Sequence, residues 1–102
     1  MHLIQIFLPL SDETGQRFQR DEYEQVEHTL ISQFDGFTAY RRAPAKGLWR
    51  SPSSEVQEDE LIIYEVMAET VDRAWWTDYR NSLEQQFKQQ EILIRAQSIE
   101  IL

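Results

Sequence analysis

Apolar side chains follow two different periods along this chain, and the order of those periods predicts its elements. Residues 3–8, Leu-Ile-Gln-Ile-Phe-Leu, form a short apolar run that ends at a proline, which is typical of a buried β-strand. Similar runs predict further strands over residues 37–43, 59–67 and 92–102. The last of these should carry a bulge near Ser98, because its apolar alternation slips there.

Two longer segments instead repeat apolar residues at spacings of three and four, the period of an amphipathic helix. The first starts at Asp21, which is expected to cap it, and ends at Gly36. The second starts at Asp72 and ends near Gln90. The apolar stripes expected to be core are Tyr23, Val26, Leu30 and Phe34 in the first helix and Trp76, Tyr79, Leu83 and Phe87 in the second.

The segment 45–58 breaks this regularity. It holds Gly47, Pro52 and three serines, so it is expected to be an irregular surface connection in a long antiparallel hairpin of the second and third strands. Trp49 lies within it, where an indole has no local core to enter. We therefore expect Trp49 to cover the sheet, a partner subunit or a ligand.

The resulting order is strand-helix-strand-strand-helix-strand over a single domain, residues 1–102. This order predicts an α+β fold of the ferredoxin-like β-α-β-β-α-β type, in which a four-stranded antiparallel sheet carries two helices on one face. A chain of this length is long enough to form one hydrophobic core.

Because side chains alternate along a strand, each predicted strand has one row facing the helices and one row facing away. The helix-facing row includes Ile4, Ile6, Leu8, Ile62, Tyr64 and Val66. The other row, here named the open face, consists of Leu3, Gln5, Phe7, Thr38, Tyr40, Arg42, Leu61, Ile63, Glu65, Met67, Leu93 and Arg95. Apolar patches of this size on soluble proteins mark interfaces or ligand clefts. We therefore expect a homodimer formed through the open face, with Phe7, Tyr40 and Ile63 in the interface.

The charge balance changes which partners are expected. The chain has 18 acidic and 10 basic side chains and a formal net charge of -8 at pH 7, which repels the phosphates of nucleic acids and of anionic membranes. It has no cysteine, which excludes disulfides and thiolate chemistry. The apolar run 3–8 is too short and too polar for a signal peptide or a membrane span. We expect no nucleic-acid partner, no membrane partner and a cytoplasmic location.

The candidate binding residues lie on the open face. They are the polar residues Gln5, Tyr40, Arg42, Glu65 and Arg95, with Phe7 and Trp49 as apolar walls. A few convergent polar groups between apolar walls are typical of a small-molecule site. A solid dimer interface, in which Glu65 pairs with Arg42 or Arg95, accounts for the same residues more simply, because an unpaired buried charge is costly.

Metal and cofactor sites are not predicted. His28 lies four residues after Glu24, but two ligands do not make a metal site, and a solvated helix face accounts for both. The acidic run 55–60 lacks the spacing of a calcium loop. We expect no cofactor.

Three local strings occur in order over residues 34–93. They are Phe34-Asp35-Gly36-Phe37-Thr38, Gly47-Leu48-Trp49-Arg50, and Tyr79 followed by the run from Phe87 to Leu93. They resemble an uncharacterised family of short bacterial domains of unknown function with the patterns F-x-D/G-G-x-T, G-x-W-R and Y-x-x-x-F-x-Q-x-x-V/I-L. The order of elements is also similar to the dimeric α+β barrels, which include cofactor-free monooxygenases and haem-degrading enzymes. The resemblance implies a fold and a dimer, and function has to be argued from the site.

Two functions fit these observations. The first is a small bacterial binding or regulatory module that dimerises through the open face and leaves room there for a small-molecule ligand. The alternative is a small cofactor-free monooxygenase- or isomerase-like enzyme, in which Arg42 or Arg95 holds an anionic substrate and Tyr40 or Glu65 moves a proton.

Overall fold

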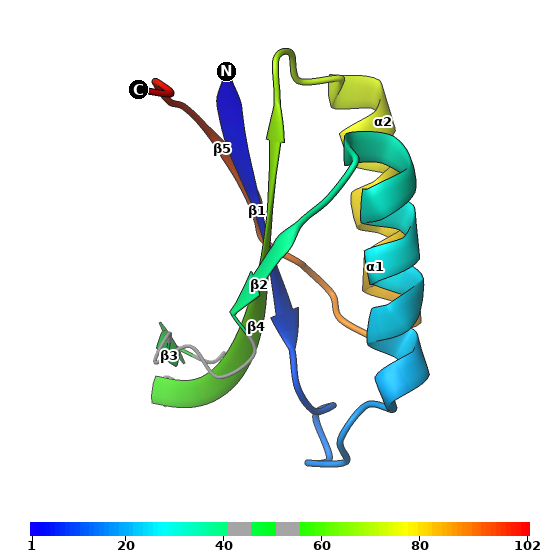
Figure 1. The fold of residues 1–102 in the computed structure, drawn as a ribbon. Helices are drawn as coiled ribbons and strands as arrows, with labels where there is room; N and C mark the ends of the chain where they lie inside the picture. Colours follow the sequence, from blue (N-terminus) through cyan, green and yellow to red (C-terminus); the bar gives the residue numbers. More distant parts are fainter. Residues whose placement is uncertain (41–45, 51–55) are drawn as a thin grey trace.

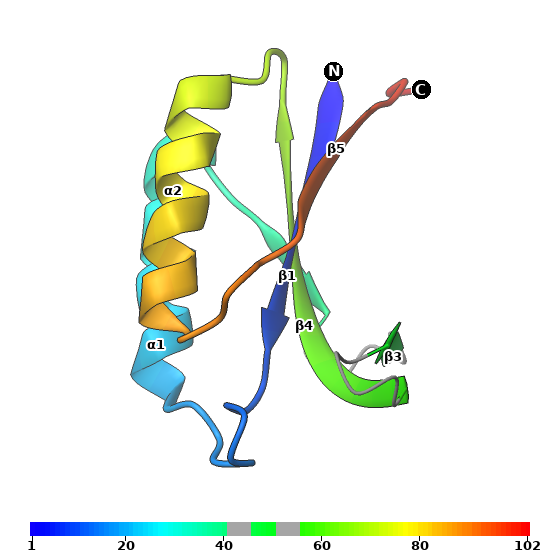
Figure 2. The same ribbon diagram turned by 180° about the vertical axis from the view of Figure 1, so that it is seen from behind.

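The computed structural model describes residues 1–40, 46–50 and 56–102, with the backbone alone described over 46–50 and 56–60. The elements along it are β1 (His2–Pro9), α1 (Arg20–Phe34), β2 (Thr38–Tyr40), β3 (Lys46–Arg50), β4 (Val56–Ala68), α2 (Arg73–Gln86) and β5 (Ile94–Ser98). The two helices lie side by side on one face of the sheet (Figures 1 and 2). No helix in the described ranges is long and apolar enough to cross a membrane.

The main sheet has the strand order β2-β4-β1-β5, and each neighbouring pair is antiparallel. The N-terminal strand β1 is therefore central, with Gln5 opposite Glu65 on β4 and opposite Arg95 on β5. Two helices on one face of a four-stranded antiparallel sheet form the ferredoxin-like arrangement. The predicted fold class is confirmed.

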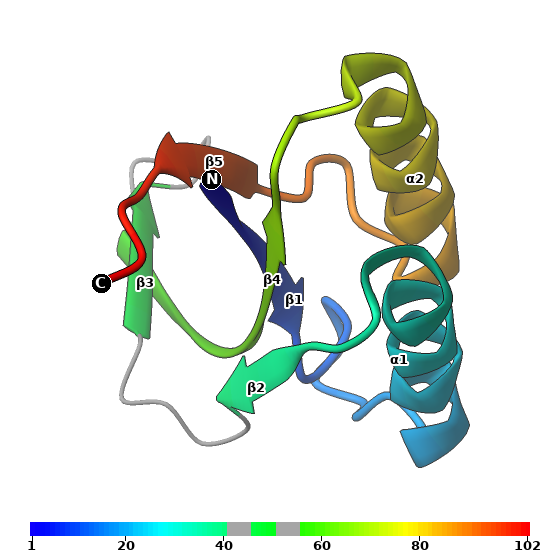
Figure 3. The same ribbon diagram turned by 45° about the horizontal axis from the view of Figure 1, so that its top comes forward.

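The prediction that residues 45–58 are irregular is wrong for residues 46–50 and 56–58, which lie in strands, and residues 45 and 51–55 lie outside the described residues. β3 pairs antiparallel with the first part of β4, with Trp49 opposite Gln57, and β4 begins at Val56 rather than Asp59. Strand pairing uses the backbone N–H and C=O of each residue, so it does not require apolar alternation in the sequence. β4 curves along its length, and its first part carries β3 to the side of the sheet away from the helices (Figure 3). Of the predicted strand 37–43, the structure describes β2, and the part from residue 41 onward lies outside the described residues.

The core lies between the sheet and the helices, and it follows the predicted alternation. Ile4, Ile6, Leu8, Ile62, Tyr64 and Val66 are all at most 3% exposed. Val26 and Leu30 of α1 and Leu83 of α2 pack in the same cluster. The helix-facing row of the sheet and the two helix stripes therefore form one hydrophobic core.

The ends of α1 differ from the prediction. The helix begins at Arg20 after Gln19, which makes no side-chain capping bond, so Asp21 lies in the first turn and is not the cap. A carboxylate in that turn still stabilises the helix, because it faces the positive end of the helix dipole. At the other end Asp35, not Gly36, takes the left-handed conformation, with φ of 64°, and donates its N–H to the carbonyl of Ile31. Aspartate is one of the residues that tolerates this conformation.

α2 begins as predicted and ends earlier. The Asp72 carboxylate accepts a hydrogen bond from the Trp75 N–H at 3.1 Å, so it caps the helix. The helix ends at Gln86 rather than near Gln90, and Phe87 follows it fully buried. Of the two consecutive tryptophans, Trp76 is 7% exposed and belongs to the core, while Trp75 packs at its margin.

The last strand is shorter than predicted. β5 covers Ile94–Ser98. The strand ends at Ser98, where a bulge was predicted. Ile92 is buried before the strand begins, and its N–H donates to the Glu84 carboxylate at 3.0 Å. The apolar alternation slips at this end because Ile99 and the residues after it no longer belong to the strand.

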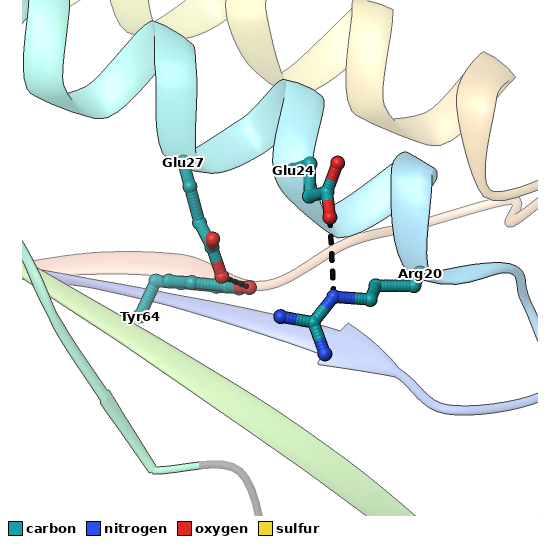
Figure 4. A network of polar contacts seen from close by, with 4 residues as sticks. All are labelled: Arg20, Glu24, Glu27 and Tyr64. Atoms are coloured by element: carbon teal, nitrogen blue, oxygen red, sulfur yellow. Dashed lines mark hydrogen bonds and ion pairs between the residues drawn. The ribbon is translucent and has the colours of Figure 1, made fainter.

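Polar contacts tie α1 to the sheet. The Tyr64 hydroxyl, inside the core, donates to the Glu27 carboxylate at 2.8 Å, and the two side chains point toward each other in Figure 4. At the start of the same helix Arg20 forms an exposed ion pair with Glu24 at 3.1 Å (Figure 4). Because exposed pairs contribute little to stability, the Tyr64–Glu27 contact is the more important of the two.

Candidate functional site

The open face brings polar side chains from four strands into one row across the sheet. Gln5 of β1 lies directly between Glu65 of β4 and Arg95 of β5, because both are its partners in the strand register. Tyr40 of β2 lies diagonally from Glu65, since Tyr40 is opposite Ile63 two positions earlier on β4. Cross-strand and diagonal neighbours on one face are close enough for side chains to touch.

Gln5 connects the two charged residues of this row. Its Nε2 donates to Oε2 of Glu65 at 2.6 Å, and its Oε1 accepts from Nε of Arg95 at 2.8 Å. The amide thus presents its donor to the anion and its acceptor to the cation, which fixes its orientation. In the described part of the chain Glu65 and Arg95 form no direct ion pair, so of the two pairings suggested by the sequence, Glu65–Arg95 is replaced by a bridge through the neutral side chain of Gln5, and Glu65–Arg42 lies outside the described residues.

Tyr40 extends the row to the fourth strand. Its hydroxyl faces the Glu65 carboxylate, whose hydrogen bonding and negative charge raise the pKa of Tyr40 above its ordinary value. A tyrosine hydroxyl is protonated at neutral pH, and here its one proton is directed at the Glu65 carboxylate. With 45% of its surface exposed, Tyr40 presents its ring and its hydroxyl to solvent or to a ligand.

Apolar groups border the polar row. The Arg95 guanidinium lies over the ring of Phe7, 4.9 Å from its centroid, which is the geometry of a cation–π contact. Met67 is 53% exposed and Leu93 is 50% exposed on the same face, and the Leu93 carbonyl accepts from the Phe7 N–H at 3.0 Å. The face thus combines a hydrogen-bonded polar row with large apolar side chains that the described chain leaves half uncovered.

Three other residues were predicted for the open face or its cover. Arg42 lies outside the described residues. Trp49 is placed by its backbone on β3, on the side of the sheet to which the open face points, and not in an irregular loop (Figure 3). Ile63 is 9% exposed, so it is buried within its own chain and has little surface left for the predicted dimer interface.

The remaining predicted residues, Gln5, Phe7, Tyr40, Glu65 and Arg95, lie together. The position of β3 was missed, because its two large apolar residues, Leu48 and Trp49, are adjacent and show no alternation that would place it beside a sheet face. No three side chains of His, Asp or Glu gather as a metal-binding group in the described ranges.

Comparison with known proteins gives a fold but no family. No protein-family model matches the chain, and no curated protein matches it. Among solved structures, a phage SAM lyase in complex with S-methyl-5'-thioadenosine is similar, with 11% sequence identity and a TM-score of 0.60. The match covers 95% of this chain and 80% of that chain. The chain therefore shares the α+β fold of this lyase.

Proposed function

We propose that the open face binds a small molecule with a nucleoside-like part. The observation that carries the proposal is the continuous polar row Arg95–Gln5–Glu65–Tyr40, which crosses all four strands of the main sheet and is bordered by Phe7. Ligand sites are typically apolar surfaces with a few polar groups held in fixed positions. Here hydrogen bonds among the polar groups hold them in position.

The chemistry of the row suits a nucleoside. The carboxylate of Glu65 is the kind of acceptor that recognises ribose hydroxyls. Tyr40 offers an exposed ring on which a base can stack. The similar lyase has S-methyl-5'-thioadenosine bound, and its overall fold covers nearly the whole of this chain, which supports a ligand of this class.

A small enzyme acting without a bound cofactor is the second candidate, and the Tyr40–Glu65 pair favours it. A hydroxyl held against a carboxylate can pass a proton to or from a reacting group. S-adenosylmethionine carries a positive sulfonium, which a negative carboxylate such as Glu65 would attract. The fold neighbour is itself a lyase. The pure binding module and the enzyme share one site and differ in whether the bound molecule is converted.

Glu65→Gln is expected to weaken the binding of S-methyl-5'-thioadenosine about 10- to 100-fold, the effect of losing one hydrogen bond to a charged group. Isothermal titration calorimetry with this nucleoside and with adenosine measures the change. Glu69→Gln, which makes the same charge change on an exposed residue just after β4, is the matched control and should bind as the parent does. Equal affinities for the parent and both variants would contradict the site. Release of S-methyl-5'-thioadenosine from S-adenosylmethionine, abolished by Glu65→Gln, would select the enzyme.

We further propose that the open face forms a homodimer around this site. The chain has a mass of 12.2 kDa, and sedimentation at micromolar concentration should give twice that mass. Leu93→Glu should shift the protein to monomer, because it places a charge on a half-exposed apolar residue of the open face. Ile31→Glu, a change at an equally exposed residue on α1, should leave the dimer intact. A parent protein that sediments as a monomer would remove the proposed interface.

A further inference from the structure

A groove lies between α2 and the edge strand β5, on the helix side of the sheet and away from the open face. Its volume is about 570 Å³, within the range of small-molecule sites. The residues that matter for its chemistry are Arg73, Trp76 and Arg80 on α2, with His2, Ile94 and Ser98 on the two neighbouring strands.

The groove exists because α2 does not cover the end of β5. On the central strand β1, the helix-facing Ile4 is 1% exposed. On β5, the helix-facing row starts with the half-buried Ile94 and continues with the exposed Ala96 and Ser98. The apolar lining of the groove, here named its floor, consists of Ile4, Trp76 and Ile94, and the uncovered part of β5 lines its other side.

The charge of the groove is opposite to the charge of the chain. Arg73 and Arg80 are seven residues apart on α2, so they lie on one side of the helix about 10 Å apart along its axis. His2 lies across the groove from the helix, with its Nδ1 3.2 Å from the Glu69 carbonyl oxygen. None of the described residues that line the groove is acidic, although the chain has a net charge of -8.

The two arginines are available to a ligand. In residues 1–40 and 61–102 the one ion pair is Arg20–Glu24, and neither Arg73 nor Arg80 makes a side-chain hydrogen bond there. Arg95 also borders the groove, but Gln5 holds its side chain on the open face. Guanidinium groups bind phosphate oxygens with paired, charge-assisted hydrogen bonds.

We propose that this groove binds a phosphate monoester that carries a planar apolar group, such as a nucleoside monophosphate. The doubly negative phosphate lies between Arg73 and Arg80, and the planar group lies on the floor beside Trp76 and Ile94. The site is separate from the open face, because the groove lies on the helix side of β1 and β5 and the open face lies on the other side of these strands. Binding in the groove therefore does not depend on the function proposed above for the open face.

The experiment compares AMP with adenosine, which differ by the phosphate alone, using NMR titrations of backbone amide signals. AMP should shift the amides of Thr77, Ala96 and Ser98 with one saturable curve, and adenosine should leave them in place. The double variant Arg73→Gln/Arg80→Gln should weaken AMP binding at these amides at least about tenfold, since each charge-assisted contact contributes that much.

Two controls distinguish binding in the groove from a general effect of lost positive charge and from binding at the open face. Arg17→Gln/Arg20→Gln removes the same charge from two exposed arginines near the start of α1 and should leave the AMP affinity unchanged. Glu65→Gln should also leave it unchanged, because Glu65 belongs to the open face. The absence of saturable shifts at the groove, shifts confined to the open face, or equal losses in the two double variants would overturn the proposal.

Discussion

Leu83→Ala should lower the free energy of unfolding by about 2–5 kcal/mol, the cost of a buried leucine lost from a packed core. Leu83 is fully buried and lies on the α2 stripe, within the cluster that includes Leu30 of α1 and Tyr64 of β4. The cost has two parts, the lost burial of the side chain and the cavity left behind. Urea denaturation followed by fluorescence measures it, and the midpoint should fall while the slope stays constant.

Ile31→Ala is the matched control for this change. Ile31 follows Leu30 on α1 but is 51% exposed, so its truncation should cost less than about 1 kcal/mol. Similar losses at Leu83 and Ile31 would contradict the assignment of the helix stripes to the core.

Tyr64→Phe should lower the free energy of unfolding by about 1.5–3 kcal/mol, because it removes a hydrogen bond to a charged group inside the protein. The Tyr64 hydroxyl donates to the Glu27 carboxylate at 2.8 Å, and the ring is completely buried. The substitution keeps the ring, so the packing of the core is retained. The decrease in the free energy of unfolding measures how much this contact contributes to holding α1 on the sheet.

Tyr23→Phe provides the comparison. The Tyr23 hydroxyl donates to the Pro9 carbonyl at 2.7 Å, an uncharged acceptor, so its loss should cost about 0.5–1.5 kcal/mol. Both measurements use the same denaturation curves. A larger loss at Tyr23 than at Tyr64 would show that the charge on Glu27 does not strengthen the Tyr64 contact.

The fold could be predicted because hydrophobic periodicity determined both the elements and their buried sides. The row Ile4, Ile6 and Leu8 was sufficient to orient β1, since a shift of one residue would expose the whole row. Helix ends were less predictable. Asp35 rather than Gly36 takes the left-handed conformation, and the sequence offers both as adjacent residues able to adopt it.

β3 could not be predicted, because nothing in its side chains distinguishes a paired strand from a loop. Lys46–Arg50 pairs with the mostly polar residues 56–60 of β4, and its register is that of the backbone pairing with them. A sequence pattern records which side chains are buried. It does not record backbone pairing where neither face of the ribbon has an apolar row.

The members of the candidate site were predictable from strand parity, but their contacts were not. Alternation placed Gln5, Glu65 and Arg95 on one face, and opposite charges suggested a direct ion pair. The strand register places Gln5 between Glu65 and Arg95, which makes the connection indirect. The α2–β5 groove was missed, because Arg73 and Arg80 have the spacing of ordinary solvent-facing helix residues, and the sequence does not show that the end of β5 is uncovered.

The central position of β1 also determines how this chain has to fold. Leu3 pairs with Met67 on one side and with Gln97 on the other, so both neighbours of the strand lie more than half the chain length away. Contacts between such distant residues are slow to form, because a long loop must close before any pairing offsets its entropy. During synthesis β1 is made before β4 and β5, so its apolar row stays unpaired until both strands follow. This topology therefore requires that β1 be kept from associating with other chains until its partner strands are present.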